Sequence, residues 1–458
     1  MKKLFLLFFM MIALFTRAQN TLEKHYGDTM DCSGLNAIET FDEGFLITAS
    51  KNPGSQSDDD LFIIRTNQFG DTLWTKTILL ESGIVSKGIQ TFDSGYVFTG
   101  RADIYLFIFK VNSLGDLLWT KRYNFGTTYS FGRSIIESSD HNLFVVGENF
   151  LGDTTCCTPL IIKTDLSGNL LASYNLPNAD YGRAYDIVET PDSNFVISYS
   201  EINNSPPVPM LSKINKNGSV LWYKLYDGYC DCNVNLTHDN GFIISGFQIN
   251  TSKPYLIKTD SAGNVIWNKN SSAYSVFNNN LKVTQSNDDG YLMVGGSNDS
   301  LSDLILLKVN SLGDSIWGKV FGGSGDDFGN SIITTNDNGF AIVGYTTSFG
   351  SAFKEVYFLK TDSLGLITSI NKYQIEEKPI KIFPNPFSNS TTLQTSTEFK
   401  NLTLSVLNSF GEEVKQFNNI NGNSFTFYRD NLPSGIYFLR LSQKDELITS
   451  GKIVIIDN

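Results

Sequence analysis

The stretch TNDNGFAIVG, residues 335–344, contains the motif that decides the fold. Its Asp337 stands two residues before Gly339, and an aromatic residue and an apolar run follow. The pattern Asp-x-(Gly/Asn)-(aromatic or Leu) occurs seven times, at Asp42–Phe45, Asp93–Tyr96, Asp140–Leu143, Asp192–Phe195, Asp239–Phe242, Asp288–Tyr291 and Asp337–Phe340. The steps between successive aspartates are 51, 47, 52, 47, 49 and 49 residues, which indicates an internal repeat.

The run Asn336, Asp337 and Asn338 also invites comparison with an oxygen-rich calcium loop. A loop of the EF-hand type needs oxygen ligands at alternate positions and Glu at position twelve. With Gly339 at position six, position twelve is Tyr345 and Asp337 falls out of phase. The other six copies lack the extra oxygens, so we interpret the stretch as a hairpin turn and predict no metal site.

A second signature, (Lys/Arg)-x-(Asn/Asp)-x-x-Gly, alternates with the first. It occurs at Arg65–Gly70, Lys110–Gly115, Lys163–Gly168, Lys213–Gly218, Lys258–Gly263, Lys308–Gly313 and Lys360–Gly365. Four residues after the glycine, five copies carry all five tryptophans of the chain: Trp74, Trp119, Trp222, Trp267 and Trp317. The third and seventh copies have Ala172 and Ser369 there.

Both signatures suit hairpin turns, because Asx side chains bond nearby backbone and Gly or Asn tolerates positive φ. Two hairpins per repeat make four strands, and seven four-stranded units predict an all-β, seven-bladed β-propeller. A sandwich array or a β-solenoid explains seven equal units less well. The tryptophans are expected to pack between blades. Residues 20–26, with Lys24 aligned on Lys319, are expected to supply an outer strand that replaces or supplements the weak strand after Gly365 at the ring closure.

The N-terminus predicts export. Lys2 and Lys3 precede an apolar run over residues 4–15, and small residues precede a cleavage point between Ala18 and Gln19. Residues 1–18 therefore read as a signal peptide, since a membrane anchor requires nearer twenty apolar residues. No transmembrane segment is expected in the mature chain. The formal net charge of −12, without a basic run, argues against a nucleic-acid surface.

The repeats, assigned to residues 19–373, are followed by a linker at 374–379 and a segment of different pattern at 380–458. Alternating apolar residues and turn signals predict six or seven short strands there, a small β-sandwich. This segment contains four short motifs, listed in chain order: Pro384-Asn385-Pro386, Gly411 after Leu407-Asn408-Ser409-Phe410, the run Leu432-Pro433-Ser434-Gly435-Ile436-Tyr437, and Lys452.

These tail residues resemble the type A C-terminal sorting domain of the type IX secretion system. Asn408 and Glu412 depart from the usual Asp and basic residue. The repeats resemble secreted bacterial β-propeller repeats (SBBP-like), which prescribe no activity. The resemblance implies passage through the periplasm, export by the type IX secretion machinery, removal of the tail by a sortase-like protease, and a product that is secreted or held at the outer cell surface.

No catalytic or cofactor motif is evident, so no catalytic residue, cofactor or metal ligand is predicted. The three histidines are scattered, and His141 and His238 lie at turns. Acidic clusters at 58–60 and 326–327 read as solvated loops. Two functions stay open: a non-enzymatic binding or adhesion protein, which we favour, and a secreted glycan hydrolase with its site at the propeller channel.

Function is expected on the face opposite the hairpin turns, which carries the long connections 50–60, 148–159 and 200–209. An extracellular glycan or protein is the expected ligand. All five cysteines are predicted to lie in connections on this face. A disulfide between the pair Cys156/Cys157 and the pair Cys230/Cys232 is conceivable in an exported protein, with Cys32 remote from both.

Overall fold

The computed structural model describes residues 21–27, 29–52, 60–79, 83–126, 128–150, 152, 157–176, 182–201, 208–227, 233–248, 253–270, 276–297, 302–350, 353–367, 380–408, 413–443 and 446–457. The chain divides into two compact units, Met1–Thr368 and Ser369–Asn458. The predicted signal peptide and the predicted linker lie outside the described residues. The described part contains no helix long and apolar enough to cross a membrane.

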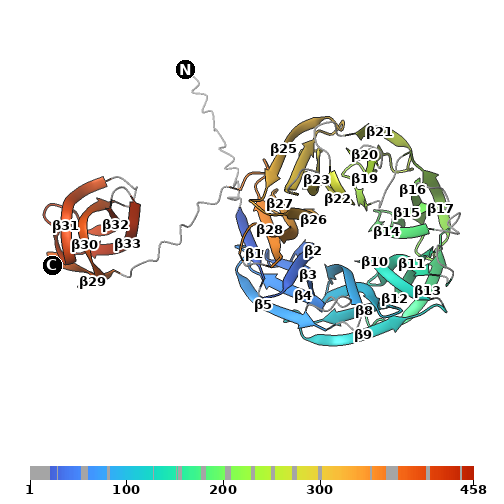
Figure 1. The fold of residues 1–458 in the computed structure, drawn as a ribbon, viewed down its shortest axis with the longest axis horizontal. Helices are drawn as coiled ribbons and strands as arrows, with labels where there is room; N and C mark the ends of the chain where they lie inside the picture. The colour runs from blue at the N-terminus through green and yellow to red at the C-terminus, as the bar shows by residue number, and fades with distance from the viewer. Residues whose placement is uncertain are drawn as a thin grey trace, which may run out of the picture. The chain divides into compact units, whose positions relative to one another are not determined.

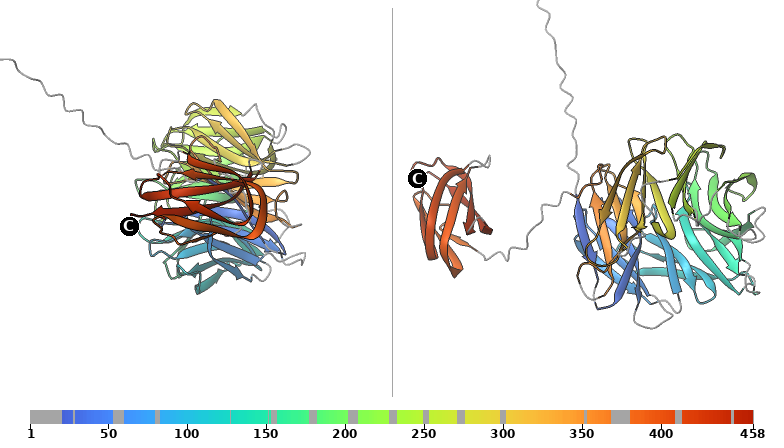
Figure 2. Two further views of the ribbon diagram at one scale, coloured as in Figure 1. Left: turned by 90° about the vertical axis from the view of Figure 1, so that its left-hand side faces the viewer. Right: turned by 45° about the horizontal axis from the view of Figure 1, so that its top comes forward.

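The first unit is a ring of seven four-stranded antiparallel sheets, as the repeat predicts (Figures 1 and 2). We number them as blades and give each from its inner to its outer strand. Blades 1 to 3 are β2 (Asp31–Glu39), β3 (Phe45–Asn52), β4 (Asp60–Thr66), β5 (Thr72–Ile78); β6 (Gly83–Gln90), β7 (Tyr96–Ala102), β8 (Tyr105–Val111), β9 (Leu117–Tyr123); and β10 (Tyr129–Glu137), β11 (Leu143–Phe150), β12 (Cys157–Thr164), β13 (Leu170–Asn175). Blades 4 to 6 are β14 (Gly182–Glu189), β15 (Phe195–Glu201), β16 (Val208–Ile214), β17 (Val220–Leu225); β18 (Asn233–Leu236), β19 (Phe242–Gln248), β20 (Lys253–Thr259), β21 (Val265–Asn270); and β22 (Val276–Gln285), β23 (Tyr291–Ser297), β24 (Leu304–Val309), β25 (Ser315–Phe321).

Blade 7 is built from both ends of the repeat region. Its strands β26 (Asp327–Thr334), β27 (Phe340–Thr346) and β28 (Glu355–Thr361) are completed on the outside by β1 (Leu22–Tyr26). β1 pairs antiparallel with β28, from Leu22 opposite Lys360 to Tyr26 opposite Val356. The expected closure by residues 20–26 is confirmed, and β1 occupies the outer place in the sheet.

The core lies between successive blades. The second and third strands are apolar and largely buried on both faces, as in β27 and β28, whereas outer strands such as β5 alternate exposed and half-buried residues. Aromatic rings pack across the boundaries between blades. The ring centres of Phe45 and Phe358 are 5.0 Å apart across blades 1 and 7, and those of Phe144 and Phe195 are 4.2 Å apart across blades 3 and 4. Burial between blades therefore explains the apolar runs of the sequence.

The Asp turns differ in one detail from the expectation. Positive φ falls on the middle residue of the motif, at Glu43, Ser94, His141, Ser193, Asn240, Asp289 and Asn338. The expectation that the following Gly or Asn supplies positive φ is therefore wrong here. Gly339 serves another purpose, because a Cβ there would lie 2.2 Å from the carbonyl oxygen of Thr361. In the second turn, the seven glycines do have positive φ, between 67° and 80°.

Five of the seven outer strands carry a tryptophan that packs on a glycine of the next blade, and in blade 3 Tyr174 packs on Gly218 instead. Every tryptophan is half-buried, and Trp267 packs on Gly313 of the following blade, where a Cβ would lie 2.8 Å from the ring. Two residues on, Lys269 donates to Asp314 at 3.0 Å. At the ring closure Leu22 and Lys24 take these places, with Lys24 3.2 Å from Asp71. The predicted packing role is thus observed at the rim of the blades.

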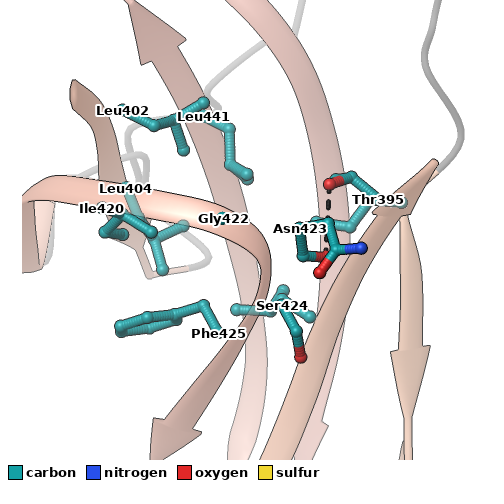
Figure 3. A pocket seen from close by; sticks show the side chains of 11 residues that line it. Thr395, Leu402, Leu404, Ile420, Gly422, Asn423, Ser424, Phe425 and Leu441 are labelled. Atoms are coloured by element: carbon teal, nitrogen blue, oxygen red, sulfur yellow. Dashed lines mark hydrogen bonds between the residues drawn. The ribbon is translucent and has the colours of Figure 1, made fainter. Parts of the chain in front are cut away.

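The second unit is a five-stranded sheet formed by β29 (Lys381–Phe383), β30 (Ser390–Leu407), β31 (Glu413–Tyr428), β32 (Gly435–Gln443) and β33 (Glu446–Ile455). The expectation of an all-β tail is confirmed, but its strands are longer than predicted and belong to one sheet rather than to a two-sheet sandwich. β30 and β31 are long, and their pairing shifts register four times, so a single sheet folds over one core. Figure 3 shows the apolar gap inside this fold, between Leu402 and Leu404 of β30 and Phe425 of β31.

Candidate functional site

We call the face that carries the Asp and Gly turns the hairpin face and the opposite one the loop face. The tips of the three long predicted connections, residues 53–59, 153–156 and 202–207, lie outside the described residues, as does residue 151. The strand ends that support the connections 148–159 and 200–209 are described, and they belong to blades 3 and 4. A group of arginine and tyrosine side chains gathers at these ends.

Arg133 and Glu148 form the central ion pair of this group. Arg133 Nε and Nη2 lie 2.5 Å and 2.7 Å from the two carboxylate oxygens of Glu148, a bidentate contact. The Glu148 side chain is 2% exposed and that of Arg133 is 25% exposed. Arg133 stands at a β-bulge of inner strand β10, between Gly132 and Ser134, and a bulge re-aims a side chain.

Arg183 extends the group into blade 4. Its Nε donates to Cys157 Sγ at 3.5 Å. Tyr185 stands at the corresponding bulge of β14, and its ring lies 5.4 Å from the guanidinium carbon of Arg133. Burial raises the pKa of the Cys157 thiol, with Arg183 opposing, so this side chain is neutral at physiological pH.

Arg101, from β7 of blade 2, is the third arginine of this group. Its guanidinium carbon lies 5.0 Å from the ring centre of Tyr129, which in turn stacks on Phe150 at 4.3 Å. Arg101 Nε is buried, and it has no hydrogen-bond partner among the described residues. Arg101 is thus a cation without a carboxylate partner in the described part of the chain.

We call these seven residues the arginine cluster: Arg101, Tyr129, Arg133, Glu148, Cys157, Arg183 and Tyr185. Their electrostatic coupling shows that they lie together. Burial raises the pKa of Tyr129, Glu148 adds to this rise, and Arg101 and Arg183 oppose it. Three guanidinium groups face one carboxylate, so the cluster carries an excess of positive charge in a chain of net charge −12.

The channel formed by the inner strands has its own polar network. Lys87 Nζ lies 2.9 Å from Asp186 Oδ1 and 2.9 Å from Ser134 Oγ, which joins blades 2, 3 and 4. Burial alone raises the pKa of Asp186, yet Lys87 and Lys282 hold that pKa below its usual range. Asp186 is therefore an ionised, cation-paired group and lacks the raised pKa of a general acid.

Acidic side chains at the hairpin-face end of the channel also have structural partners. Glu137 accepts from Phe92 N at 2.9 Å, and Glu189 accepts from Ser139 N at 2.8 Å, each across a blade boundary. Similar contacts are made by Glu39, Gln90 and Gln285. These side chains hold neighbouring blades together.

A second hollow, of about 430 Å³, opens on the hairpin face between blades 5 and 6. His238 and Asp289 pair across it at 2.9 Å, and Trp267 and Tyr291 line it. Both members of the pair are more than half exposed, so the pair contributes little to stability. The exposed positions of His238 and His141 agree with the interpretation as turn residues.

Several predicted residues fall elsewhere. Ala18, Gln19, Cys156, Cys230, Cys232 and Gly411 lie outside the described residues. Cys157 is a buried free thiol in β12. Its three possible partners lie outside the described residues, so a disulfide among the four named cysteines stays a prediction. Cys32 and Cys157 lie in strands rather than in connections, which corrects the placement of those two. Asp327 is buried at the start of β26 and accepts from Gly323 N at 2.9 Å, so its interpretation as a solvated loop residue is wrong.

The motif residues of the tail are placed around β33. Asn385 Nδ2 donates to Lys452 O and Asn385 Oδ1 accepts from Val454 N, both at 2.8 Å. Tyr437 donates its hydroxyl to Pro433 O at 2.9 Å. Leu432, Pro384, Pro386, Gly435 and Lys452 lie in the turns and strand that these bonds connect. The motif thus fixes the end of the sheet in place.

The arginine cluster was missed by sequence reasoning, because its members come from three blades at places that the repeat does not share. Two other features left a signal in the sequence. A Thr or Ser stands two residues before each motif Asp, and donates to it in all seven copies. A Glu or Gln stands three residues before the Asp in five copies.

Comparison with known proteins identifies the tail. Residues 381–456 match the family model described as secretion system C-terminal sorting domain. None of the curated proteins matches the chain.

Solved structures similar to the chain are remote in sequence. PorZ, described as an essential surface component of the type IX secretion system of Porphyromonas gingivalis, aligns at 9% identity and TM-score 0.41, over 90% of this chain. The chain spans 58% of the length of that structure. A prolyl endopeptidase aligns at 8% identity and TM-score 0.44, over 91% of this chain and 55% of its own. A luciferin-regenerating enzyme aligns at 10% identity and TM-score 0.40, over 61% of this chain and 91% of its own.

The motif, its contacts with β33 and the family match agree. Residues 381–456 are a C-terminal sorting domain of the type IX secretion system, which marks the chain for export to the cell surface or the medium.

Proposed function

We propose that the mature propeller is a non-enzymatic binding scaffold that acts outside the cell and takes its ligand on the loop face. The type IX machinery delivers it, and a sortase-like protease removes the tail. The arginine cluster is the observation that carries the proposal. It gathers three cations and aromatic rings at the base of two long connections on a rigid ring, the usual place for binding residues on such scaffolds.

The state of the channel supports binding over hydrolysis. Glycoside hydrolysis uses two carboxyl groups with separate roles, one of them an acid of raised pKa. The described channel carboxylate, Asp186, is paired with Lys87, and Glu137 and Glu189 hold neighbouring blades together. A hydrolase would have to disturb contacts that the propeller uses for its own assembly.

The experiment is a screen of the mature chain against glycan and matrix-protein arrays, run beside a panel of chromogenic glycosides. Saturable binding without turnover is the expected result. Turnover that Asp186→Asn abolishes, in a variant with unchanged unfolding temperature, would support the hydrolase instead. Absence of binding on every array would contradict the scaffold proposal.

A further inference from the structure

The arginine cluster defines the chemistry of its ligand. Guanidinium groups are planar donors that match carboxylate and sulfate oxygens in pairs. Arg133 already makes such a paired contact with the carboxylate of Glu148. Arg183 has a thiol as its Nε partner, and Arg101 Nε is buried with no partner among the described residues. Neither Arg101 nor Arg183 is ion-paired with a carboxylate among the described residues, so two of the three cations carry a charge that no described carboxylate compensates.

The rings of the cluster add a second preference. Tyr129 lies under Arg101, and Tyr185 lies beside Arg133. Both tyrosines are half-buried, so part of each residue reaches the surface beside the guanidinium groups. Aromatic residues interleaved with cations suit a ligand that presents both a ring and an acid on each unit, which is the chemistry of an acidic sugar.

We infer that the arginine cluster is a binding site for an acidic glycan, with Arg101 and Arg183 as the residues that bind its carboxylate or sulfate groups. The inference rests on the proposed scaffold function and names its ligand class. Arg133 is a positioning residue, because its ion pair with Glu148 holds the cluster together between β10 and β11.

The test measures binding of the chain from Gln19 onward, with the tail still attached, to immobilised polygalacturonate, chondroitin sulfate and neutral dextran. The first two probes separate carboxylate from sulfate recognition. Arg101→Gln and Arg183→Gln are each expected to weaken binding to the preferred acidic probe by about ten-fold or more, the loss of a charge-assisted contact. Arg122→Gln, the same charge change on an exposed residue of outer strand β9, is the matched control and should bind like the parent chain.

Equal weakening by all three variants would overturn the inference, since it would reflect net charge alone. So would unchanged binding by Arg101→Gln and Arg183→Gln. Binding to dextran or to an array protein but to neither acidic probe would overturn the ligand class and leave the scaffold function standing. Unfolding temperatures of the variants, expected to match the parent, separate loss of the site from loss of the fold.

Discussion

Lys360 Nζ lies 2.7 Å from Asp337 Oδ1, and this ion pair joins the two turn motifs that repeat along the chain. The same contact recurs in every blade, as Arg65–Asp42, Lys110–Asp93, Lys163–Asp140, Lys213–Asp192, Lys258–Asp239 and Lys308–Asp288. The cation comes from the third strand and the carboxylate from the turn between the first two strands. Each pair therefore fastens three strands of one blade.

Removing one carboxylate should destabilise the propeller. Lys308 is 3% exposed, so Asp288→Asn leaves a nearly buried cation without its charge partner. We expect a loss of about 2 kcal/mol in the free energy of unfolding, below the 3–5 kcal/mol of a fully buried pair because Asp288 is half-exposed. Urea denaturation followed by tryptophan fluorescence measures it, since all five tryptophans belong to the propeller.

The neighbouring residue supplies the control. Asp289→Asn makes the same chemical change one position on, where the side chain is exposed and φ is 60°, a conformation that Asn tolerates. This substitution should change the free energy of unfolding by no more than about 0.5 kcal/mol. Equal losses from the two variants would show that the ion pair adds nothing specific.

The aspartate pairs also predict how stability depends on pH. Burial alone raises the pKa of Asp239, but its bonds with Thr237 and Lys258 lower it to about 2, and Asp140 and Asp288 behave alike. A carboxyl group whose pKa is depressed on folding adds stability above its unfolded pKa and loses it as pH falls through the folded one. The free energy of unfolding should therefore fall between about pH 4 and pH 2, by at most about 1 kcal/mol for each of these half-exposed groups, and the unfolding temperature should fall with it. A constant or rising value across that interval would contradict the assignment.

The sequence predicts features that depend on a few adjacent residues, and it does not predict contacts between residues far apart in the chain. The turns at Asp337 and Gly365 are set by a few adjacent residues, so their repetition predicted the blades, and the alignment of Lys24 predicted the closure. The bend of β30 depends on register shifts against β31, which a strand pattern does not encode. Arg101 and Arg183 are separated by two blade boundaries, so their approach follows from ring geometry alone.

Two glycine variants distinguish how much stability comes from the contact between an outer strand and the next blade and how much from backbone conformation. Gly313 has φ +80°, and an added Cβ would lie 2.8 Å from Trp267 and Lys269. Gly126 has φ +74° with open space around it. Gly126→Ala should cost about 1 kcal/mol from its backbone conformation, whereas Gly313→Ala should cost about 2–3 kcal/mol because the Trp267 ring must also move. Similar losses for the two, from urea denaturation, would show that the ring is free to yield.

Closure by β1 predicts the effect of shortening the mature chain. A chain that begins at Gly27 loses the pairing with β28, the burial of Leu22 and the bond from the Tyr26 hydroxyl to Gly70 O at 2.7 Å. We expect a loss of at least about 3 kcal/mol, and aggregation through the uncovered edge of β28. A chain that begins at Thr21 keeps β1 and is the matched control. Equal unfolding temperatures would show that the ring closes without β1.

The tail motif predicts a change confined to the sorting domain. Asn385 bonds Lys452 O and Val454 N through its side-chain amide, so Asn385→Ala frees both backbone groups of β33. Hydrogen exchange at the Val454 amide should become about ten-fold faster, since the loss of such a bond raises the population of the locally open state. Asn389→Ala, at an exposed position nearby, should leave that amide unchanged. Tryptophan fluorescence should report the same propeller stability in both variants, because the tail contains no tryptophan. Unaltered exchange at Val454 in Asn385→Ala would show that the two Asn385 bonds do not hold β33 in place.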